Sequence, residues 1–433
     1  MKPAHPRSLV DWLAHIERQH PKSIDMGLER VREVARRLGL KRPARHVITV
    51  GGTNGKGSTV AFIEAIARAA GLKVGAYTSP HLRAYNERVR IDGADVRDAE
   101  LVAGFEAIDA ARRDPYGEGA AVVPLTYFEY GTLAALWLFE RADLDLAILE
   151  VGLGGRLDAT NLVDSDVAVV TTVDIDHQDY LGDDRETIGF EKAGIARAWK
   201  PLVLGDDDPP SSVLGHAYAI GASALRIGCD FFFAPVDAGQ WRWHEVGYEL
   251  LLPMPRLAGP VQLRNAAVAI AALRALDVVV PGAAVIEGVV TAHVPGRLQR
   301  FQREGVEIVV DVGHNPQAAR ELAAWLRASP APGRTHAVFA ALADKDVAAV
   351  AEALTASIEA WHLAGLAEHA PRGADVATFA ARLAGTAAGE GRRHADVAQA
   401  LAAARQTARP GDRILVFGSF HTAAAALDRL AAD

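Results

Sequence analysis

Short runs of Val, Ile and Leu recur along the chain, and longer stretches with apolar residues at every third or fourth position separate them. The runs are mostly continuous, which is typical of central parallel strands that helices cover on both faces. We therefore predict six buried strands, at 46–50, 144–151, 166–173, 306–312, 336–340 and 413–417.

The stretches between these runs have the spacing of helices. Before the first strand, Leu28, Val31, Ala35 and Leu38 share one helical face, and Gly39 ends the pattern. Strand followed by helix, repeated along a chain, predicts parallel sheets with crossover connections and so an α/β fold. The other predicted helices lie at 58–70, 132–141, 265–276 and 317–327.

Two regions interrupt the alternation. Residues 205–259 contain the sequence DDDPP and Gly-separated runs with Trp241 and Trp243, which predict an irregular β-rich appendage or a small antiparallel sheet. The sequence HVPGR at 293–297 joins a helical stretch to a new strand-helix series. Its Pro-Gly pair predicts a hinge between two domains.

Composition limits the classes of function. At about 150 residues per domain, 433 residues predict two or three domains, each with its own core. The net charge of −8 disfavours general binding to nucleic acid or to an anionic membrane. The single cysteine, Cys229, fits a reducing compartment, and no apolar run approaches the ~20 residues of a membrane span. We therefore expect a cytoplasmic protein.

The strongest chemical signal is GGTNGKGS at 51–58, between a predicted strand and a predicted helix. A glycine-rich turn lets backbone N–H groups converge on phosphate oxygens, and a lysine can neutralise the β- and γ-phosphates. The spacing departs from the general P-loop pattern, because Gly57 stands between Lys56 and Ser58. We predict a nucleoside triphosphate site, and an ordinary tight turn is the alternative.

Two polar side chains stand where neighbouring predicted strands end. Glu150 directly precedes GLGGR, and His177 closes the sequence DIDH after the next strand. Ligands bind at the carboxyl ends of strands in open α/β sheets, so a carboxylate there can hold Mg²⁺ against a nucleotide. Mg²⁺ prefers oxygen ligands, and a structural role remains the alternative for Glu150 and for His177.

Eleven motifs, in order along nearly the whole chain, resemble the folylpolyglutamate synthase and dihydrofolate synthase family, which is related to the Mur ligases. The Mur ligases are a poorer match, because they usually carry a whole domain before the phosphate loop and only 50 residues precede Gly51 here. The motifs are GTNGKGS (52–58), TSPHL (78–82), LTYFE (125–129), LEVGLGGRLDATN (149–161), DHQDYLG (176–182), EKAGI (191–195), RNA (264–266), PGR (295–297), DVGHNP (311–316), DKD (344–346) and GSFHT (418–422).

The resemblance implies an α/β architecture of two domains. Residues 1–294 would form a P-loop domain, with a mainly parallel sheet flanked by helices, that binds ATP and the pterin substrate. Residues 295–433 would form a smaller, Rossmann-like glutamate-ligase domain. We expect a monomer whose partners are small molecules, with no nucleic-acid or membrane partner.

The activity implied is an ATP-dependent ligase that joins L-glutamate to dihydropteroate and further glutamates to reduced folates, through an acyl phosphate, releasing ADP and phosphate. A monofunctional folylpolyglutamate synthase is the closest alternative. The motifs at 125–129 and 157–159 favour the bifunctional enzyme. A P-loop switch protein, in which nucleotide only changes shape, is an alternative from another class.

The resemblance also implies roles for individual residues. It places ATP and two Mg²⁺ ions in the site, and it matches Lys192 to a lysine that the family carbamylates. The catalytic residues would be Lys56, Lys192 and His314. An unmodified lysine on a helix surface is the alternative for Lys192, and a structural role is the alternative for His314. ATP would contact Asn54, Gly55, Lys56, Gly57, Ser58, Asn265, Arg297 and Asp311. The pterin substrate would contact Thr126, Tyr127, Phe128, Glu129, Leu157, Asp158 and Ala159. The metal ligands would be Ser79, Glu150 and His177.

Overall fold

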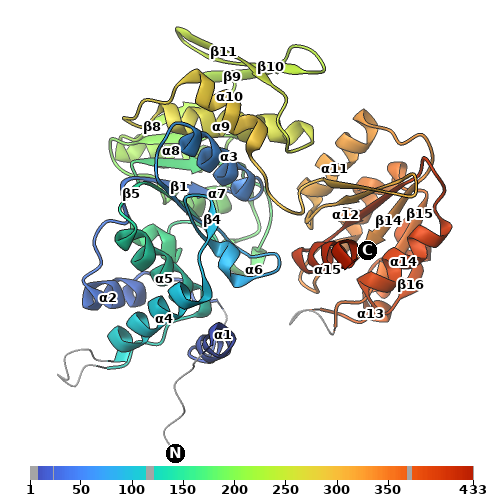
Figure 1. Cartoon of the computed structure of the whole chain (residues 1–433), viewed down its shortest axis with the longest axis horizontal. Helices are drawn as coiled ribbons and strands as arrows, with labels where there is room; N and C mark the ends of the chain where they lie inside the picture. The colour runs from blue at the N-terminus through green and yellow to red at the C-terminus, as the bar shows by residue number, and fades with distance from the viewer. Residues whose placement is uncertain (1–7, 23, 114–120, 368–372, 433) are drawn as a thin grey trace, which may run out of the picture. The chain divides into compact units, whose positions relative to one another are not determined.

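The computed structural model describes residues 8–22, 24–113, 121–367 and 373–432 (Figure 1). The chain divides into two compact units. The first unit comprises Met1–Arg256 and Leu263–His293, and the second comprises Leu257–Gln262 and Val294–Asp433. No helix among the described residues is long and apolar enough to cross a membrane.

The first unit is built on an eight-stranded sheet in the order β4-β3-β2-β5-β1-β6-β7-β8. Its pairs from β2 to β8 are parallel, and the pairs β2–β3 and β3–β4 are antiparallel. The strands are β1 (Ala44–Gly51), β2 (Val74–Tyr77), β3 (Val89–Ile91), β4 (Ala94–Asp95), β5 (Leu144–Glu150), β6 (Val167–Val170), β7 (Pro201–Leu204) and β8 (Ser223–Arg226).

Strand β1 lies at the middle of this sheet, with β5 on one side and β6 on the other. Val50 pairs with Glu150, and Gly51 pairs with Val170. The glycine-rich loop after β1, the carboxylate that ends β5 and the segment that follows β6 therefore share one edge of the sheet.

Helices connect the parallel strands, and side-chain caps define several of their ends. Thr126 and Glu129 form a capping box at the start of α5, and Asp184 caps α7. The helices of this unit are α1 (Leu9–Glu17), α2 (Glu29–Leu38), α3 (Lys56–Ala69), α4 (Asp98–Arg113), α5 (Tyr127–Arg141), α6 (Gln178–Leu181), α7 (Arg185–Ala193), α8 (Ser211–Ile220), α9 (Pro260–Arg274) and α10 (Gly282–Thr291), with 3₁₀ turns η1 (Tyr85–Arg88) and η2 (Ala159–Leu162).

The predicted β-rich appendage is present as a three-stranded antiparallel sheet, β9 (Phe231–Pro235), β10 (Gln240–Glu245) and β11 (Tyr248–Pro253). Trp241 and Trp243 are fully buried, and the Trp243 indole N–H donates to the Ala267 carbonyl of α9. The prediction of irregular structure from residue 205 onward was wrong for 211–220, which form helix α8. Pro210 precedes that helix, and Gly221 ends it in the left-handed conformation.

The second unit has a six-stranded sheet in the order β12-β13-β17-β14-β15-β16, parallel except for edge strand β12. The rings of Phe339 and Phe417 stack in its core at 4.7 Å. The elements are β12 (Gln299–Arg303), β13 (Val306–Val310), β14 (Thr335–Phe339), β15 (Ala360–Ala364), β16 (Arg392–His394), β17 (Arg413–Phe417), α11 (Pro316–Ala328), α12 (Val347–Leu354), α13 (Val376–Ala381), α14 (Val397–Thr407), α15 (Phe420–Ala432), η3 (Thr355–Ser357) and η4 (Ala387–Glu390).

The α/β fold class predicted from the sequence is confirmed, and each of the six predicted strands overlaps an observed one. The third predicted strand was too long at its carboxyl end. Strand β6 ends at Val170, and Thr171 and Thr172, which follow it, contact the glycine-rich loop.

Candidate active site

The glycine-rich loop after β1 adopts backbone conformations that suit glycine. Gly52 has φ 141° and Gly55 has φ 88°, both in the region that L side chains rarely adopt. A Cβ at Gly55 would lie 2.6 Å from Oδ1 of Asn265 on α9. The loop and Asn265, which the sequence analysis assigned to ATP, are therefore in close contact.

Lys56 begins helix α3 directly after this loop. Its Nζ donates to the carbonyls of Gly52, at 2.9 Å, and of Thr53, at 3.0 Å. The N-terminal N–H groups of a helix add about half a positive charge at the same place. The loop thus combines an ammonium group with a positive helix end, which together suit a phosphate group.

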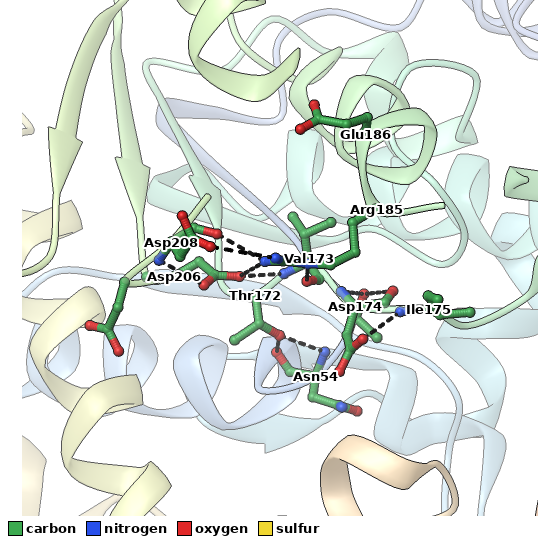
Figure 2. Close-up of polar contacts among 12 residues, drawn as sticks. Asn54, Thr172, Val173, Asp174, Ile175, Arg185, Glu186, Asp206 and Asp208 are labelled. Carbon is green, nitrogen blue, oxygen red and sulfur yellow. Dashed lines mark hydrogen bonds and ion pairs between the residues drawn. The ribbon is translucent and has the colours of Figure 1, made fainter. Parts of the chain in front are cut away.

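The segment that follows β6 supports the loop (Figure 2). The Asn54 N–H donates to Oγ1 of Thr172 at 3.2 Å, and the Thr53 N–H donates to the Thr172 carbonyl at 2.7 Å. The Thr53 hydroxyl donates to the Asp174 carbonyl, and it also accepts from the Asp174 N–H. These hydrogen bonds fix the loop against the neighbouring strand end.

Glu150 and Ser79, two of the predicted metal ligands, are in direct contact. The Ser79 N–H donates to Oε2 of Glu150 at 3.0 Å, and the side chain of Glu150 is buried. A Cβ at Gly57 would lie 3.7 Å from Oε1 of Glu150, so this carboxylate faces the first turn of α3. A carboxylate oxygen beside a phosphate-binding loop suits a hard divalent cation.

The third predicted ligand, His177, lies beyond β6 as the N-cap of α6. It has φ 53°, uncommon for a residue with a side chain, and its Nε2 lies 4.0 Å from Oδ2 of Asp176. Among the described residues, no group of three or more His, Cys, Asp and Glu side chains could hold a metal ion. The predicted set has only two such residues, because its third member is a serine.

Lys192 lies in the last turn of α7, and its side chain is buried. Burial is the main reason that the pKa of Lys192 falls to about 7, and the Lys56 charge lowers this pKa further. Asp176 and Asp158 act in the opposite direction. Lys192 is therefore close enough to Lys56 to respond to its charge, and much of its amine is neutral near pH 7.

The two segments predicted to bind a pterin meet around Gly152. A Cβ at Gly152 would lie 2.6 Å from the Phe128 ring, and the Gly152 N–H donates to the Asp158 carboxylate at 3.0 Å. Asp158 is buried, and its burial raises the pKa of its carboxyl. The Tyr127 ring meets Tyr85 edge to face at 5.6 Å. An aromatic surface and a polar loop are thus adjacent.

Glu129 has partners within the protein that its motif did not indicate. One carboxylate oxygen accepts from the Thr126 N–H at 2.7 Å, and Oε1 lies 2.9 Å from Nη2 of Arg30. Arg30 also donates to Asp25, through Nη1 to Oδ2 at 2.6 Å. In this structure Glu129 therefore caps α5 and pairs with α2, and its contact with the pterin substrate stays a prediction.

The second unit brings together Arg297, Asp311 and His314. The buried Asp311 carboxylate accepts from the N–H groups of Leu298 and Gly313, and burial raises its pKa, although the Arg297 charge acts in the opposite direction. The Arg297 guanidinium lies 5.4 Å from the centre of the Phe420 ring, and the His314 ring lies 6.3 Å from it.

Comparison with known proteins decides the family. Residues 296–420 match the model of the Mur ligase glutamate ligase domain. The chain is 46% identical, over 96% of its own length and 94% of the relative's, to the dihydrofolate synthase/folylpolyglutamate synthase of Escherichia coli K12. The chain belongs to the dihydrofolate synthase/folylpolyglutamate synthase family. The resemblance drawn from the eleven motifs is confirmed.

Solved structures of this family have the same fold. Escherichia coli FolC in complex with DHPP and ADP matches with a TM-score of 0.91 and 45% identity over 98% of each chain. A bifunctional folylpolyglutamate synthase/dihydrofolate synthase with Mn, AMPPNP and L-glutamate bound matches with a TM-score of 0.88 and 43% identity, also over 98% of each chain.

The motifs shared with the dihydrofolate synthase/folylpolyglutamate synthase family did not reveal every residue around the site. Arg30 lies in a helix for which the sequence predicts only an apolar face, and Phe420 lies in the GSFHT motif, to which no role is assigned. A charged residue at 30, between the apolar positions 28 and 31, was the available signal for Arg30. Phe420 carried no such signal, because an aromatic residue at a helix start is usually core.

Proposed function

We propose that the protein is a bifunctional ATP-dependent ligase, which joins L-glutamate to dihydropteroate and adds further glutamates to reduced folates. The full-length similarity to a relative named for both activities carries this proposal. Within the first unit, a phosphate-binding loop, a buried carboxylate and a buried lysine of low pKa support it. A monofunctional folylpolyglutamate synthase is the second candidate.

The proposal assigns one task to each part of the chain. Residues 1–294 bind ATP and the pterin substrate, with a mainly parallel sheet that presents the phosphate loop. Residues 295–433 are the glutamate-ligase domain. The match of 296–420 to the glutamate ligase domain of the Mur ligases supports the second assignment.

Asn54, Gly55, Lys56, Gly57 and Ser58 hold the phosphates of ATP in this proposal. The hydrogen bonds of the loop to Thr172 and Asp174 support it, because they fix the backbone that the phosphates contact. The contact between Asn265 and Gly55 places a side-chain amide beside the same loop. Arg297 and Asp311 are also proposed to contact ATP.

Ser79, Glu150 and His177 would hold two Mg²⁺ ions, as AMPPNP and Mn are present in a related structure. The cation supplies positive charge at the phosphates, which lowers the barrier to attack by an anionic nucleophile. Glu150 suits this role, because burial restricts its carboxylate to one position beside the loop.

Lys192 is carbamylated in this proposal. The reaction forms a bond between the amine nitrogen and the carbon of CO₂, and the amine releases a proton. Only a neutral amine reacts, and a pKa of about 7 makes much of Lys192 neutral at physiological pH. Asp176 and Asp158 raise this pKa, and the positive Lys56 nearby would stabilise the carbamate anion.

The ligase reaction needs an activated carboxylate, because oxide is a poor leaving group. A carboxylate oxygen of the pterin substrate attacks the γ-phosphorus, the bond to ADP breaks and an acyl phosphate forms. The glutamate amine then attacks the acyl carbon, and inorganic phosphate leaves with that oxygen. Lys56 stabilises charge on the transferred group, and His314 lies on the glutamate side.

The pterin ring would stack against Tyr127 and Phe128, and the loop at 157–159 would contact its polar edge. The adjacency of Phe128, Gly152 and Asp158 supports this placement. Thr126 and Glu129 hold the start of α5, so they set the direction of both aromatic rings.

An ADP-release assay tests the function. Dihydropteroate plus glutamate is run beside tetrahydrofolate plus glutamate, each with ATP and Mg²⁺ and with glutamate omitted as control. Release with both substrates supports the bifunctional enzyme, and release with tetrahydrofolate alone selects the monofunctional one. Release with dihydropteroate alone contradicts the elongating activity, and release with neither points to a nucleotide switch.

A further inference from the structure

One residue in the segment that follows β6, Val173, is held through both its N–H and its carbonyl (Figure 2). The Val173 N–H donates to Oδ2 of Asp206 at 3.0 Å, and the Val173 carbonyl accepts from Nε of Arg185 at 3.0 Å. Arg185 and Asp206 also meet each other, Nη2 to Oδ2, at 3.4 Å. The three residues thus form a closed ring of hydrogen bonds. The side chain of Asp206 is mostly buried, at 17% exposed.

The residues on either side of Val173 are those that hold the phosphate loop. Thr172 contacts the backbone of Asn54, and Asp174 contacts Thr53. The same segment continues to His177. The N–H and the carbonyl of Val173 belong to two successive peptide groups. The ring of hydrogen bonds therefore restrains both the peptide that joins Thr172 to Val173 and the peptide that joins Val173 to Asp174.

The loop that carries Asp206 also reaches the other parts of the site. Arg185 stands in the first turn of α7, and Lys192 stands in its last turn. Arg264 of α9 donates to the Gly205 carbonyl at 3.0 Å and also pairs with Asp207. The next residue, Asn265, contacts Gly55 of the phosphate loop.

We infer that Asp206 is a positioning residue for the nucleotide and metal site, acting through Val173 and Arg185. This inference rests on the proposed function. Asp206 holds in place the segment that contacts the phosphate loop and that carries His177. Loss of Asp206 therefore lowers the affinity for the nucleotide and leaves the pterin surface unchanged. A charged acceptor matters here, because its hydrogen bonds are stronger than those of a neutral one.

The test uses Asp206→Ala in the full-length protein, with binding of AMPPNP in the presence of Mn²⁺ measured by calorimetry. We expect the dissociation constant to rise about tenfold, which is the change expected from the loss of one charge-assisted hydrogen bond. The KM for dihydropteroate stays within about twofold of the wild-type value. Asp206→Asn keeps an acceptor for the Val173 N–H and so shows a smaller rise, about threefold.

Asp166→Ala is the matched control. The Asp166 carboxylate also accepts a backbone N–H from another strand, that of Val47 at 3.0 Å, and it also pairs with an arginine, Arg42. Its side chain is 20% exposed, but it precedes β6 and so lies at the opposite edge of the sheet. We expect an unchanged dissociation constant in this variant.

Two results would overturn the inference: an unchanged dissociation constant in folded Asp206→Ala, or an equal rise in the Asp166→Ala control. If Asp206→Ala does not fold, the dissociation constant of Asp206→Asn is used instead. An unchanged dissociation constant in that variant contradicts the positioning role of Asp206. Wild-type protein that binds AMPPNP and Mn²⁺ but releases no ADP with either pterin substrate would contradict the proposed function alone.

Discussion

At the scale of single residues, the chemistry of the site depends on charges that the protein places close together. The Lys56 ammonium lies on the phosphate loop, and its charge helps to depress the pKa of the buried Lys192. Glu150 offers a buried carboxylate near the start of α3. Lys56 therefore affects the protonation of Lys192, and Glu150 provides a negative charge suited to a cation.

Lys56→Ala should lower the rate of ADP release by about 100-fold or more, because it removes a preorganised charge from the transferred phosphoryl group. The fold should survive, since the Lys56 side chain donates to carbonyls of its own loop and lies outside the buried core. Thermal unfolding checks this point, and the exposed Lys41→Ala serves as control. Near-normal turnover in the folded variant would contradict the ATP site.

Lys192 should carry about 44 Da of added mass, that of CO₂, when the protein is measured under non-acidic native conditions. Carbamylation should increase as the pH rises through about 7, because the neutral amine then replaces the ammonium. Lys192→Ala should lose activity, and small carboxylates should restore part of it. Absence of both the mass and the rescue would show that Lys192 is unmodified.

Glu150→Gln should shift the Mg²⁺ titration of ADP release to higher concentration by about tenfold or more, because the amide retains the shape of the carboxylate and loses its charge. The amide oxygen can still accept the Ser79 N–H, so the fold should be kept. Glu106→Gln on the exposed face of α4 is the control. An unchanged Mg²⁺ titration would show that Glu150 has a structural role and does not bind the cation.

Local sequence indicated Lys56 and Glu150 as candidates, but it did not indicate Asp206 or Arg30. A lysine after a glycine-rich turn and a glutamate at a strand end are visible without any contact. Asp206 and Arg30 act through partners 33 and 99 residues away, Val173 and Glu129. Such pairings depend on the fold, and no spacing along the chain indicates them.

At the scale of elements, the backbones of α3 and α10 approach each other closely at Gly288. A Cβ at Gly288 would lie 2.5 Å from the backbone of Ile66. Because α3 begins at the phosphate loop, this contact supports the helix whose N-terminus faces the proposed ATP site. A larger residue at 288 has no space unless one of the two helices moves.

Gly288→Ala should therefore reduce the free energy of unfolding by about 1–3 kcal/mol, as overpacking does in other cores. Gly215→Ala on α8 is a matched control, since a Cβ there meets nothing within 4 Å. That substitution should stabilise the protein by about 0.5–1 kcal/mol, the usual gain over glycine in a helix. Urea unfolding measures both, and equal effects would contradict the packing argument.

Elements with continuous apolar runs or clear helical spacing were predictable, and short strands without such a run were not. β1, β5 and β17 follow their predicted bounds closely. Strand β2 was missed, because it has four residues and includes Gly75, where any side chain would collide with Leu144 and Phe139. Such a strand is determined by its neighbours in the sheet rather than by its own pattern.

At the scale of the whole molecule, a net charge of −8 gives no general attraction for an anionic nucleotide. Binding must therefore rest on local positive groups, such as Lys56 at the N-terminus of α3.

Transfer of ¹⁸O tests the central claim, activation of the pterin carboxylate as an acyl phosphate. Dihydropteroate labelled in both carboxylate oxygens is turned over with ATP, Mg²⁺ and L-glutamate, and the inorganic phosphate is analysed by mass spectrometry. We expect one ¹⁸O atom in each phosphate released, because the carboxylate oxygen that attacks the γ-phosphorus leaves with the phosphate. Unlabelled phosphate, or AMP carrying the label, would contradict the acyl phosphate intermediate.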